Sequence, residues 1–214
     1  MTARTNPVSL APIPADSLWQ DFYAGSQFFM QQGNIYETLR RLARQLQDEG
    51  MEYALIGGMA LVAHGYRRFT EDVDILMTPE TLEKFQERFV GRGYVPAFQG
   101  KRKVFRDTET DVRIEIVTTG EYPGDGKPKS VAFPNPAHAR LAREGIWLIT
   151  LEKLIELKLA SGLSAAHRLK DLADVQDLIL RLNLPQSFEN ELDPSVRGEY
   201  RRLWQAAQSA RAEE

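Results

Sequence analysis

The chain has 214 residues, of which 43% are hydrophobic, so it is long enough to bury a sizeable core. Its 27 Lys and Arg residues and 30 Asp and Glu residues give a formal charge of -3, which excludes a uniformly basic nucleic-acid-binding protein and leaves only a local basic surface open. The absence of cysteine excludes disulfide scaffolds and thiolate metal sites.

The chain shows no membrane or export signal. No apolar run reaches membrane-spanning length, and the N-terminus lacks the charged-then-apolar layout of a secretion signal. We therefore expect a cytoplasmic protein that does not bind a membrane.

Residues 1–33 are expected to form an N-terminal arm. Three prolines disfavour regular structure near its start, namely Pro7, Pro12 and Pro14. Five aromatic residues follow, namely Trp19, Phe22, Tyr23, Phe28 and Phe29. Such a segment either packs on the body of its own chain or docks on a partner.

The first helix is predicted to begin at Asn34 and to end near Gly50. Asn34 and Glu37 resemble a capping box. Apolar residues then recur at helical spacing, at Ile35, Leu39, Leu42 and Leu46.

Residues 53–92 alternate between strand and helix signals. The predicted elements are a strand at 53–56, a Gly57-Gly58 turn, a short helix at 59–64, a strand at 69–77 and a helix from 79 to about 92. Thr78 precedes the last helix, and Pro79 is well tolerated at a first helical position. In the second strand, Phe69, Val73 and Ile75 are expected to face the core.

The remaining chain is predicted to contain three more strands and three helices. The strands are expected at 104–106, 112–118 and 146–149, the first two as a hairpin, and the helices at about 151–161, 165–182 and 195–211. The Gly- and Pro-rich loop at 120–136 is long enough for a lid or an acceptor-binding element, or it is a plain surface excursion.

These elements predict an α/β (or α+β) fold, in which helices flank a small mixed sheet. We expect three parts: the arm at 1–33, a core at 34–150, and a C-terminal helical section at 151–214 that packs on the core.

The pair Gly57-Gly58 lies where a strand turns into a helix. Glycines at such a turn let backbone N–H groups approach an anion, and the helix dipole favours negative charge there. A plain tight turn would use the same residues.

Asp72 and Asp74 lie on one face of the second strand, because strand side chains alternate. Two neighbouring acids repel each other and need a counter-charge. Their oxygens suit Mg²⁺, which also bridges to substrate phosphates. Arg68 and Thr70 share this face if the strand begins early.

A third acid is expected on the hairpin. Asp111, Arg113 and Glu115 share one face of its second strand. The other face is apolar, with Val112, Ile114 and Ile116. Glu115 could complete a three-carboxylate metal site, and Asp111, nearer the turn, is the second choice. An ordinary solvated strand face is the alternative.

The C-terminal helices add charged residues. Lys158 lies one helical turn from Leu154 and could point at the cleft, where a lysine suits phosphate, or it could be an exposed helix lysine. Lys170, Asp171 and Asp174 could form surface ion pairs, which contribute little. Alternatively, Lys170 or Asp171 could link the helices to the site.

Three of these segments carry a resemblance. Ile56-Gly57-Gly58, then Arg68-x-Thr70-x-Asp72-Val73-Asp74-Ile75, and then a later acid on a strand resemble the DNA polymerase beta-type nucleotidyltransferase superfamily. This resemblance covers about residues 50–118. Lys158 with Arg168-x-Lys170-Asp171-x-x-Asp174 is similar to a helical motif of the abortive-infection toxin branch.

The resemblance implies a nucleotidyltransferase fold and a Mg²⁺- or Mn²⁺-dependent enzyme. Such an enzyme moves an NMP from an NTP such as ATP or GTP to an acceptor by two-metal in-line transfer and releases pyrophosphate. Asp72, Asp74 and Glu115 would be the catalytic and metal-binding residues. The third acid of the superfamily is often aspartate, so Glu115 is a departure. The nucleotide-binding residues would be Gly57, Gly58, Arg68, Thr70 and Lys158.

The acceptor stays open at this point. A toxin-like enzyme would act on RNA, tRNA included, and would imply an antitoxin partner; an antibiotic- or protein-modifying enzyme is another possibility. The Glu115 departure and the aromatic arm also allow a catalytically weak binding module with this fold. A metal-dependent enzyme that uses Asp-x-Asp on nucleotide sugars would leave Gly57-Gly58 and Lys158 without a role.

Overall fold

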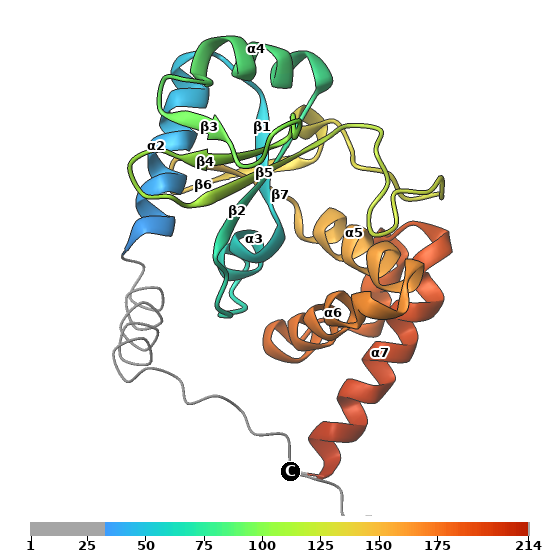
Figure 1. Cartoon of the computed structure of the whole chain (residues 1–214). Coiled ribbons are helices and arrows are strands. Elements are labelled where there is room, and N and C mark those ends of the chain that lie inside the picture. The colour runs from blue at the N-terminus through green and yellow to red at the C-terminus, as the bar shows by residue number, and fades with distance from the viewer. Residues whose placement is uncertain (1–32, 214) are drawn as a thin grey trace, which may run out of the picture.

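A seven-stranded mixed sheet lies at the centre of the molecule, as the computed structural model of residues 33–213 shows (Figure 1). The strand order is β3-β4-β5-β2-β1-β7-β6. This is the predicted α/β architecture of a mixed sheet flanked by helices. The predicted arm lies outside the described residues apart from Gly33.

Helix α2 (Asn34–Asp48) packs its predicted apolar stripe on the sheet. The predicted capping box is wrong: Gly33 is the N-cap residue, and Asn34 is already helical. The amide of Asn34 donates instead to the backbone oxygen of Thr110 at 3.3 Å. Arg41 also pairs with the buried Asp107. Tertiary contacts with the β4–β5 turn therefore replace the local cap.

Strand β1 (Tyr53–Ile56) is fully buried, as predicted. Helix α3 (Gly57–Ala63) follows without a break, so it begins at the glycine pair and not at residue 59.

Strand β2 (Asp72–Met77) is shorter than the predicted strand at 69–77. Its pairing with β1 ends at Ile56↔Asp74, because the chain turns into α3 there, and its pairing with β5 begins at Asp72. Residues 69–71 therefore lie in the loop before the strand. Phe69 is 43% exposed, so the prediction that it faces the core is wrong, whereas Val73 and Ile75 are buried.

Helix α4 (Pro79–Phe89) has the predicted cap, in which the Thr78 hydroxyl accepts from the Thr81 N–H at 3.2 Å. It ends three residues before the predicted end, and the short strand β3 (Tyr94–Pro96), which was not predicted, follows. Phe85 of α4 packs on Phe105 with ring centroids 5.2 Å apart. Helices α2 and α4 thus lie on the same side of the sheet (Figure 1).

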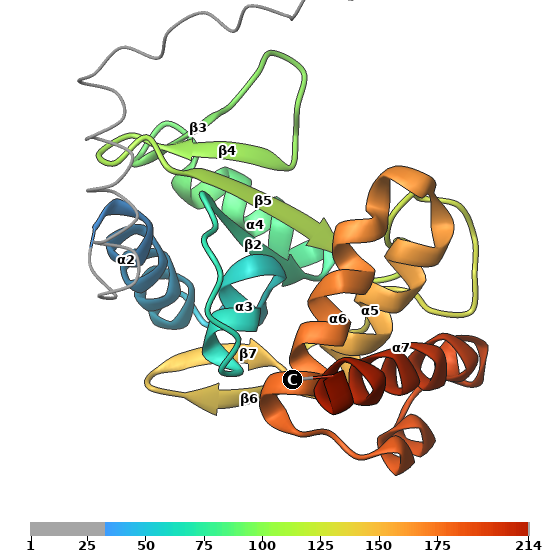
Figure 2. The same ribbon diagram turned by 90° about the horizontal axis from the view of Figure 1, so that it is seen from below.

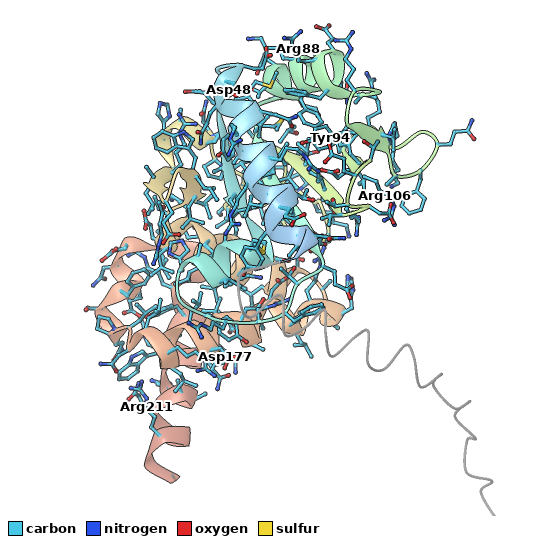
Figure 3. All side chains as sticks on the ribbon, turned by 90° about the vertical axis from the view of Figure 1, so that its left-hand side faces the viewer. Asp48, Arg88, Tyr94, Arg106, Asp177 and Arg211 are labelled. Atoms are coloured by element: carbon cyan, nitrogen blue, oxygen red, sulfur yellow. The ribbon has the colours of Figure 1, made fainter. Side chains whose placement is uncertain are left out.

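Strands β4 (Val104–Asp107) and β5 (Arg113–Thr118) form the predicted antiparallel hairpin. Strand β5 runs parallel to β2, with Asp74 opposite Glu115. The two predicted acidic strands are therefore neighbours in the sheet. Figure 3 looks onto α2 and shows Tyr94 and Arg106 on this half of the sheet, away from Asp177 and Arg211.

Strand β7 (Ile146–Ile149) was predicted, and it pairs in parallel with β1. Its partner in a hairpin, the edge strand β6 (Arg140–Arg143), was not predicted. The sequence Arg-Leu-Ala-Arg is charged and short, as is common at a sheet edge.

Three helices follow the sheet and pack on one another, α5 (Leu151–Ser164), α6 (Leu169–Leu182) and α7 (Pro194–Glu213). Short 3₁₀ helices occupy Pro136–His138, Ala166–Arg168 and Gln186–Glu191. Figure 2 shows α5–α7 gathered beside the sheet. Within residues 33–213, no helix has both the length and the apolar character that a membrane span requires.

Candidate active site

An open cleft of about 490 Å³ lies between the sheet and helices α5 and α6. It brings together all eight predicted site residues, Gly57, Gly58, Arg68, Thr70, Asp72, Asp74, Glu115 and Lys158. Asp111, the second choice for the third acid, does not line this cleft: it lies at the hairpin turn, 3.2 Å from Arg106. Of the two acids, Glu115 is therefore the one placed beside Asp74.

Three acids share one wall of the cleft. Asp72 and Asp74 project from β2, and Glu115 lies opposite Asp74 on β5. Burial, followed by the charges of Asp72 and Glu115, raises the pKa of Asp74 to about 7, although Lys158 and Arg113 act in the opposite direction. The local positive charge is therefore too small to keep Asp74 fully ionised at neutral pH.

The glycine pair makes room for this wall. Gly57 has a φ of 64°, and a Cβ atom there would lie 1.8 Å from Oδ2 of Asp74. A Cβ atom at Gly58 would lie 2.6 Å from Oγ1 of Thr70. Thr70 in turn donates to Oδ1 of Asp72 at 3.0 Å. Besides the predicted phosphate role, the glycines let the acidic strand and the preceding loop approach α3 closely.

A buried ion network forms the opposite wall. Lys158 donates to Asp171 at 2.9 Å and to Asp174 at 2.7 Å. Arg68 also pairs with Asp174, at 2.6 Å. Ser161 donates to Asp171 at 2.6 Å. Although burial alone would raise the pKa of Asp171, Lys158 and Ser161 hold it below its usual value.

This network decides how Lys158 is placed. Lys158 is only 9% exposed, so the interpretation as an exposed helix lysine is wrong. Asp174 is buried too, so these are not surface ion pairs. The network joins the loop before β2 to helices α5 and α6, and it leaves Lys158 at the cleft wall.

Several residues that line the cleft were not predicted as site residues. Arg168 is 3.8 Å from Asp171 and nearly half exposed. Lys170 is exposed, and no ion pair within the described residues uses it. Phe69 and Glu71 lie at the same cleft. The sequence did contain a signal for Arg168 and Lys170, because these two basic residues flank Leu169.

The loop after β5 closes one end of the cleft with Pro123, Gly124 and Phe133. A Cβ atom at Gly124 would lie 2.0 Å from the hydroxyl oxygen of Ser164. The Asp125 N–H donates to this same hydroxyl at 3.2 Å. The loop is thus seated on the end of α5.

The donors of the acidic wall suit a hard divalent cation. Asp72 and Asp74 supply carboxylate oxygens, and burial together with the charges of Asp72 and Glu115 raises the pKa of Asp74, an effect that a bound cation would oppose. Glu115, however, accepts from Arg113 at 2.6 Å. Between residues 33 and 213, no three His, Asp or Glu side chains are arranged as a metal site. The two aspartates therefore fit Mg²⁺ or Mn²⁺, and the metal role of Glu115 stays a prediction.

No protein-family model matches the chain, and no curated protein matches it. Solved structures do match. ANT(2")-Ia in complex with adenylyl-2"-tobramycin is 10% identical, with a TM-score of 0.50, over 81% of this chain and 97% of that chain. A candidate nucleotidyltransferase from Thermotoga maritima is 16% identical, with a TM-score of 0.48, over 66% and 96% of the two chains. An antigenic nucleotidyltransferase-like protein from Paracoccidioides brasiliensis is 15% identical, with a TM-score of 0.44, over 77% and 90%. At these identities the likeness shows a nucleotidyltransferase fold.

Proposed function

We propose that this chain is a nucleotidyltransferase that moves an NMP from an NTP to an acceptor. The observation that carries the proposal is the cleft in which Asp72, Asp74 and Glu115 face cationic side chains of α5 and α6. The fold supports the same conclusion, because ANT(2")-Ia, to which it is similar, was solved with adenylyl-2"-tobramycin.

The acidic wall would hold Mg²⁺ or Mn²⁺ through Asp72 and Asp74. A bound cation would supply positive charge to the triphosphate and polarise its phosphorus–oxygen bonds. The hydrogen bond from Thr70 orients the carboxylate of Asp72. The absence of a side chain at Gly57 allows Asp74 to reach the cleft. The third acid, Glu115, lies opposite Asp74 on the neighbouring strand β5.

The opposite wall would bind the triphosphate. Lys158 is held in place by Asp171 and Asp174, so its charge needs little reorganisation when a substrate binds. Arg168 and Lys170 are exposed at the same cleft and can move towards phosphate oxygens. The backbone N–H groups of Gly57 and Gly58 would complete the phosphate site.

The acceptor that we propose is RNA, tRNA included. Exposed cations at the cleft rim suit a polyanionic acceptor, although the chain as a whole is acidic. The likeness of the Lys158–Asp174 segment to the toxin branch favours the same class. A toxin role and an antitoxin partner remain predictions of that likeness.

The test is transfer of label from each α-³²P NTP, with Mg²⁺, onto total RNA, total protein or an aminoglycoside. We expect label on RNA that is lost in Asp72→Asn and Asp74→Asn. Asp111→Asn is the matched control, because this acid lies outside the cleft, and it should transfer label like the wild type. Label that persists without both aspartates would contradict the proposal.

The same assay separates the alternative function. Glu115 is engaged by Arg113 in this structure, which favours a weakly active binding module as the second candidate. Tight NTP binding without transfer to any of the three acceptor classes would support that candidate. Label on protein or aminoglycoside alone would keep the transferase and exclude RNA as the acceptor.

A further inference from the structure

Arg113 lies at the start of strand β5, two residues before Glu115 of the acidic wall, and is not itself among the residues that line the cleft. It stands opposite Asp72 of β2 on one side and Arg106 of β4 on the other. Two residues along the same face, Glu115 stands opposite Asp74. Arg113 is thus the neighbour of Asp72 across the sheet and of Glu115 along its own strand.

Within the described residues, the guanidinium group of Arg113 uses its Nη2 donor but not its Nε donor. Its Nη2 donates to Oε2 of Glu115 at 2.6 Å. Its Nε is buried and has no acceptor among residues 33–213. The neighbouring Arg106 uses a different acid, Asp111, at 3.2 Å. Arg113 therefore has a buried donor to offer, and an unpaired buried N–H is unfavourable.

The ion pair also decides what Glu115 can do. While its oxygen accepts from Arg113, Glu115 does not form a three-acid group with the aspartates, and the described residues contain no such group. The hydrogen bond from Arg113 uses Oε2 and leaves Oε1 available, but it fixes the orientation of the Glu115 carboxylate and offsets its negative charge. Arg113 and a cation at the acidic wall therefore compete for Glu115.

We propose that Arg113 is a positioning residue that holds Glu115 apart from Asp72 and Asp74 until a nucleotide is bound. Phosphate oxygens match the fork of donors on a guanidinium, and they would also satisfy the buried Nε. Binding of the triphosphate would draw Arg113 away and release Glu115 to the aspartate pair. The inference rests on the proposed function, because it takes the two aspartates as the cation site.

The experiment measures Mn²⁺ binding in the absence of nucleotide, by titration calorimetry and by the Mn²⁺ EPR signal. The variants are Arg113→Gln, Glu115→Gln and the double variant. A half-exposed ion pair contributes a factor of up to about five. We expect Arg113→Gln to tighten Mn²⁺ binding roughly fivefold when Glu115 is present and less than about twofold when it is replaced.

Arg106→Gln is the matched control, because it removes the same charge from the opposite position on the same sheet face. The inference is overturned if both arginine variants tighten binding equally, if the effect persists without Glu115, or if Arg113→Gln weakens binding. The proposed function fails separately if the wild type binds no Mn²⁺ or if binding survives in Asp72→Asn/Asp74→Asn, and the inference then falls with it.

Discussion

Asp74 is a carboxyl group whose pKa is higher in the folded protein than its ordinary value of 3.8. Such a group destabilises the fold when it ionises, so its favourable contribution is complete below the unfolded pKa and is lost as pH rises through about 7. If the site binds a cation as proposed, ionised Asp74 reduces stability while the cation is absent, a common trade-off at functional sites.

Replacement of Asp74 by Asn tests whether ionisation of this carboxyl group reduces the stability of the fold. Without divalent cations, the stability of Asp74→Asn relative to the wild type should be greater at about pH 8 than at about pH 5 by roughly 2–3 kcal/mol, because the wild type loses stability as pH rises from 3.8 to about 7. Denaturant unfolding at the two pH values measures the difference. A constant difference at both values would show that ionisation of Asp74 is not its cause.

The affinity for cations should also follow the ionisation of Asp74, but it should increase with pH where the stability decreases. Asp74 must be ionised to bind a cation, so affinity for Mn²⁺ should increase roughly tenfold between about pH 6 and about pH 8 and then level off. Calorimetric titration across this range checks the profile. An affinity independent of pH would exclude Asp74 as a ligand whose pKa lies near 7.

Gly57 offers a sharp test of the close approach to Asp74. In Gly57→Ala the new Cβ atom would overlap the carboxylate, so transfer should decrease at least about 100-fold. Gly50→Ala is the matched control, because Gly50 has nearly the same φ, 62°, and no atom within 4 Å of the Cβ position. Both variants should lose about 1 kcal/mol of stability from backbone strain. Equal activity losses in the two would refute the steric explanation.

Among the elements, helices α5 and α6 are joined to the loop before β2 through Asp174. Both Arg68 and Lys158 donate to this one buried carboxylate. Replacing Asp174 with Ala leaves two cations short of a partner in the interior, and we expect a loss of about 3–5 kcal/mol of stability. Thermal unfolding tests this, with Glu199→Ala as control, since Glu199 pairs with the exposed Arg202 on α7 and should contribute less than about 1 kcal/mol. A small effect of Asp174→Ala would mean that solvent reaches the network.

Elements with strong local signals could be predicted from the sequence. The buried strands β1 and β7 and the start of α4 at Thr78-Pro79 are where their residues indicate. Strands β3 and β6 carry short, charged or proline-containing sequences that become strands only through a partner. The start of β2 near Phe69 depended on where β1 ends and β5 begins, which no local pattern records.

The residues of the candidate site also differ in how far the sequence could predict them. Alternation along a strand predicts that Asp72 and Asp74 share a face. Glu115 was preferred to Asp111 from the sequence, but that it lies opposite Asp74 follows only from the register between β2 and β5. The burial of Lys158 could not be predicted, because its partners lie on another helix and the fold alone brings them together.

At the scale of the whole molecule, the cleft has one wall from the sheet and another from the helical section. A ligand that contacts both walls binds only the folded state. Mg²⁺ with an NTP at about one hundred times its Kd should therefore add about 2.7 kcal/mol of stability. Thermal shift assays measure this, and the gain should disappear when EDTA removes the cation or when both aspartates are replaced. A gain that survives both treatments would place the nucleotide elsewhere.

The pairing of β1 with β7 joins Leu55 to Leu148, which are 148 - 55 = 93 residues apart in the chain. Long-range parallel pairing slows folding, because the entropy of closing a large loop is lost before the contact forms. A ribosome must release more than two thirds of the chain before this pair can form, and α6 only emerges afterwards. The acidic strand is thus made early, but its cleft is completed late in synthesis.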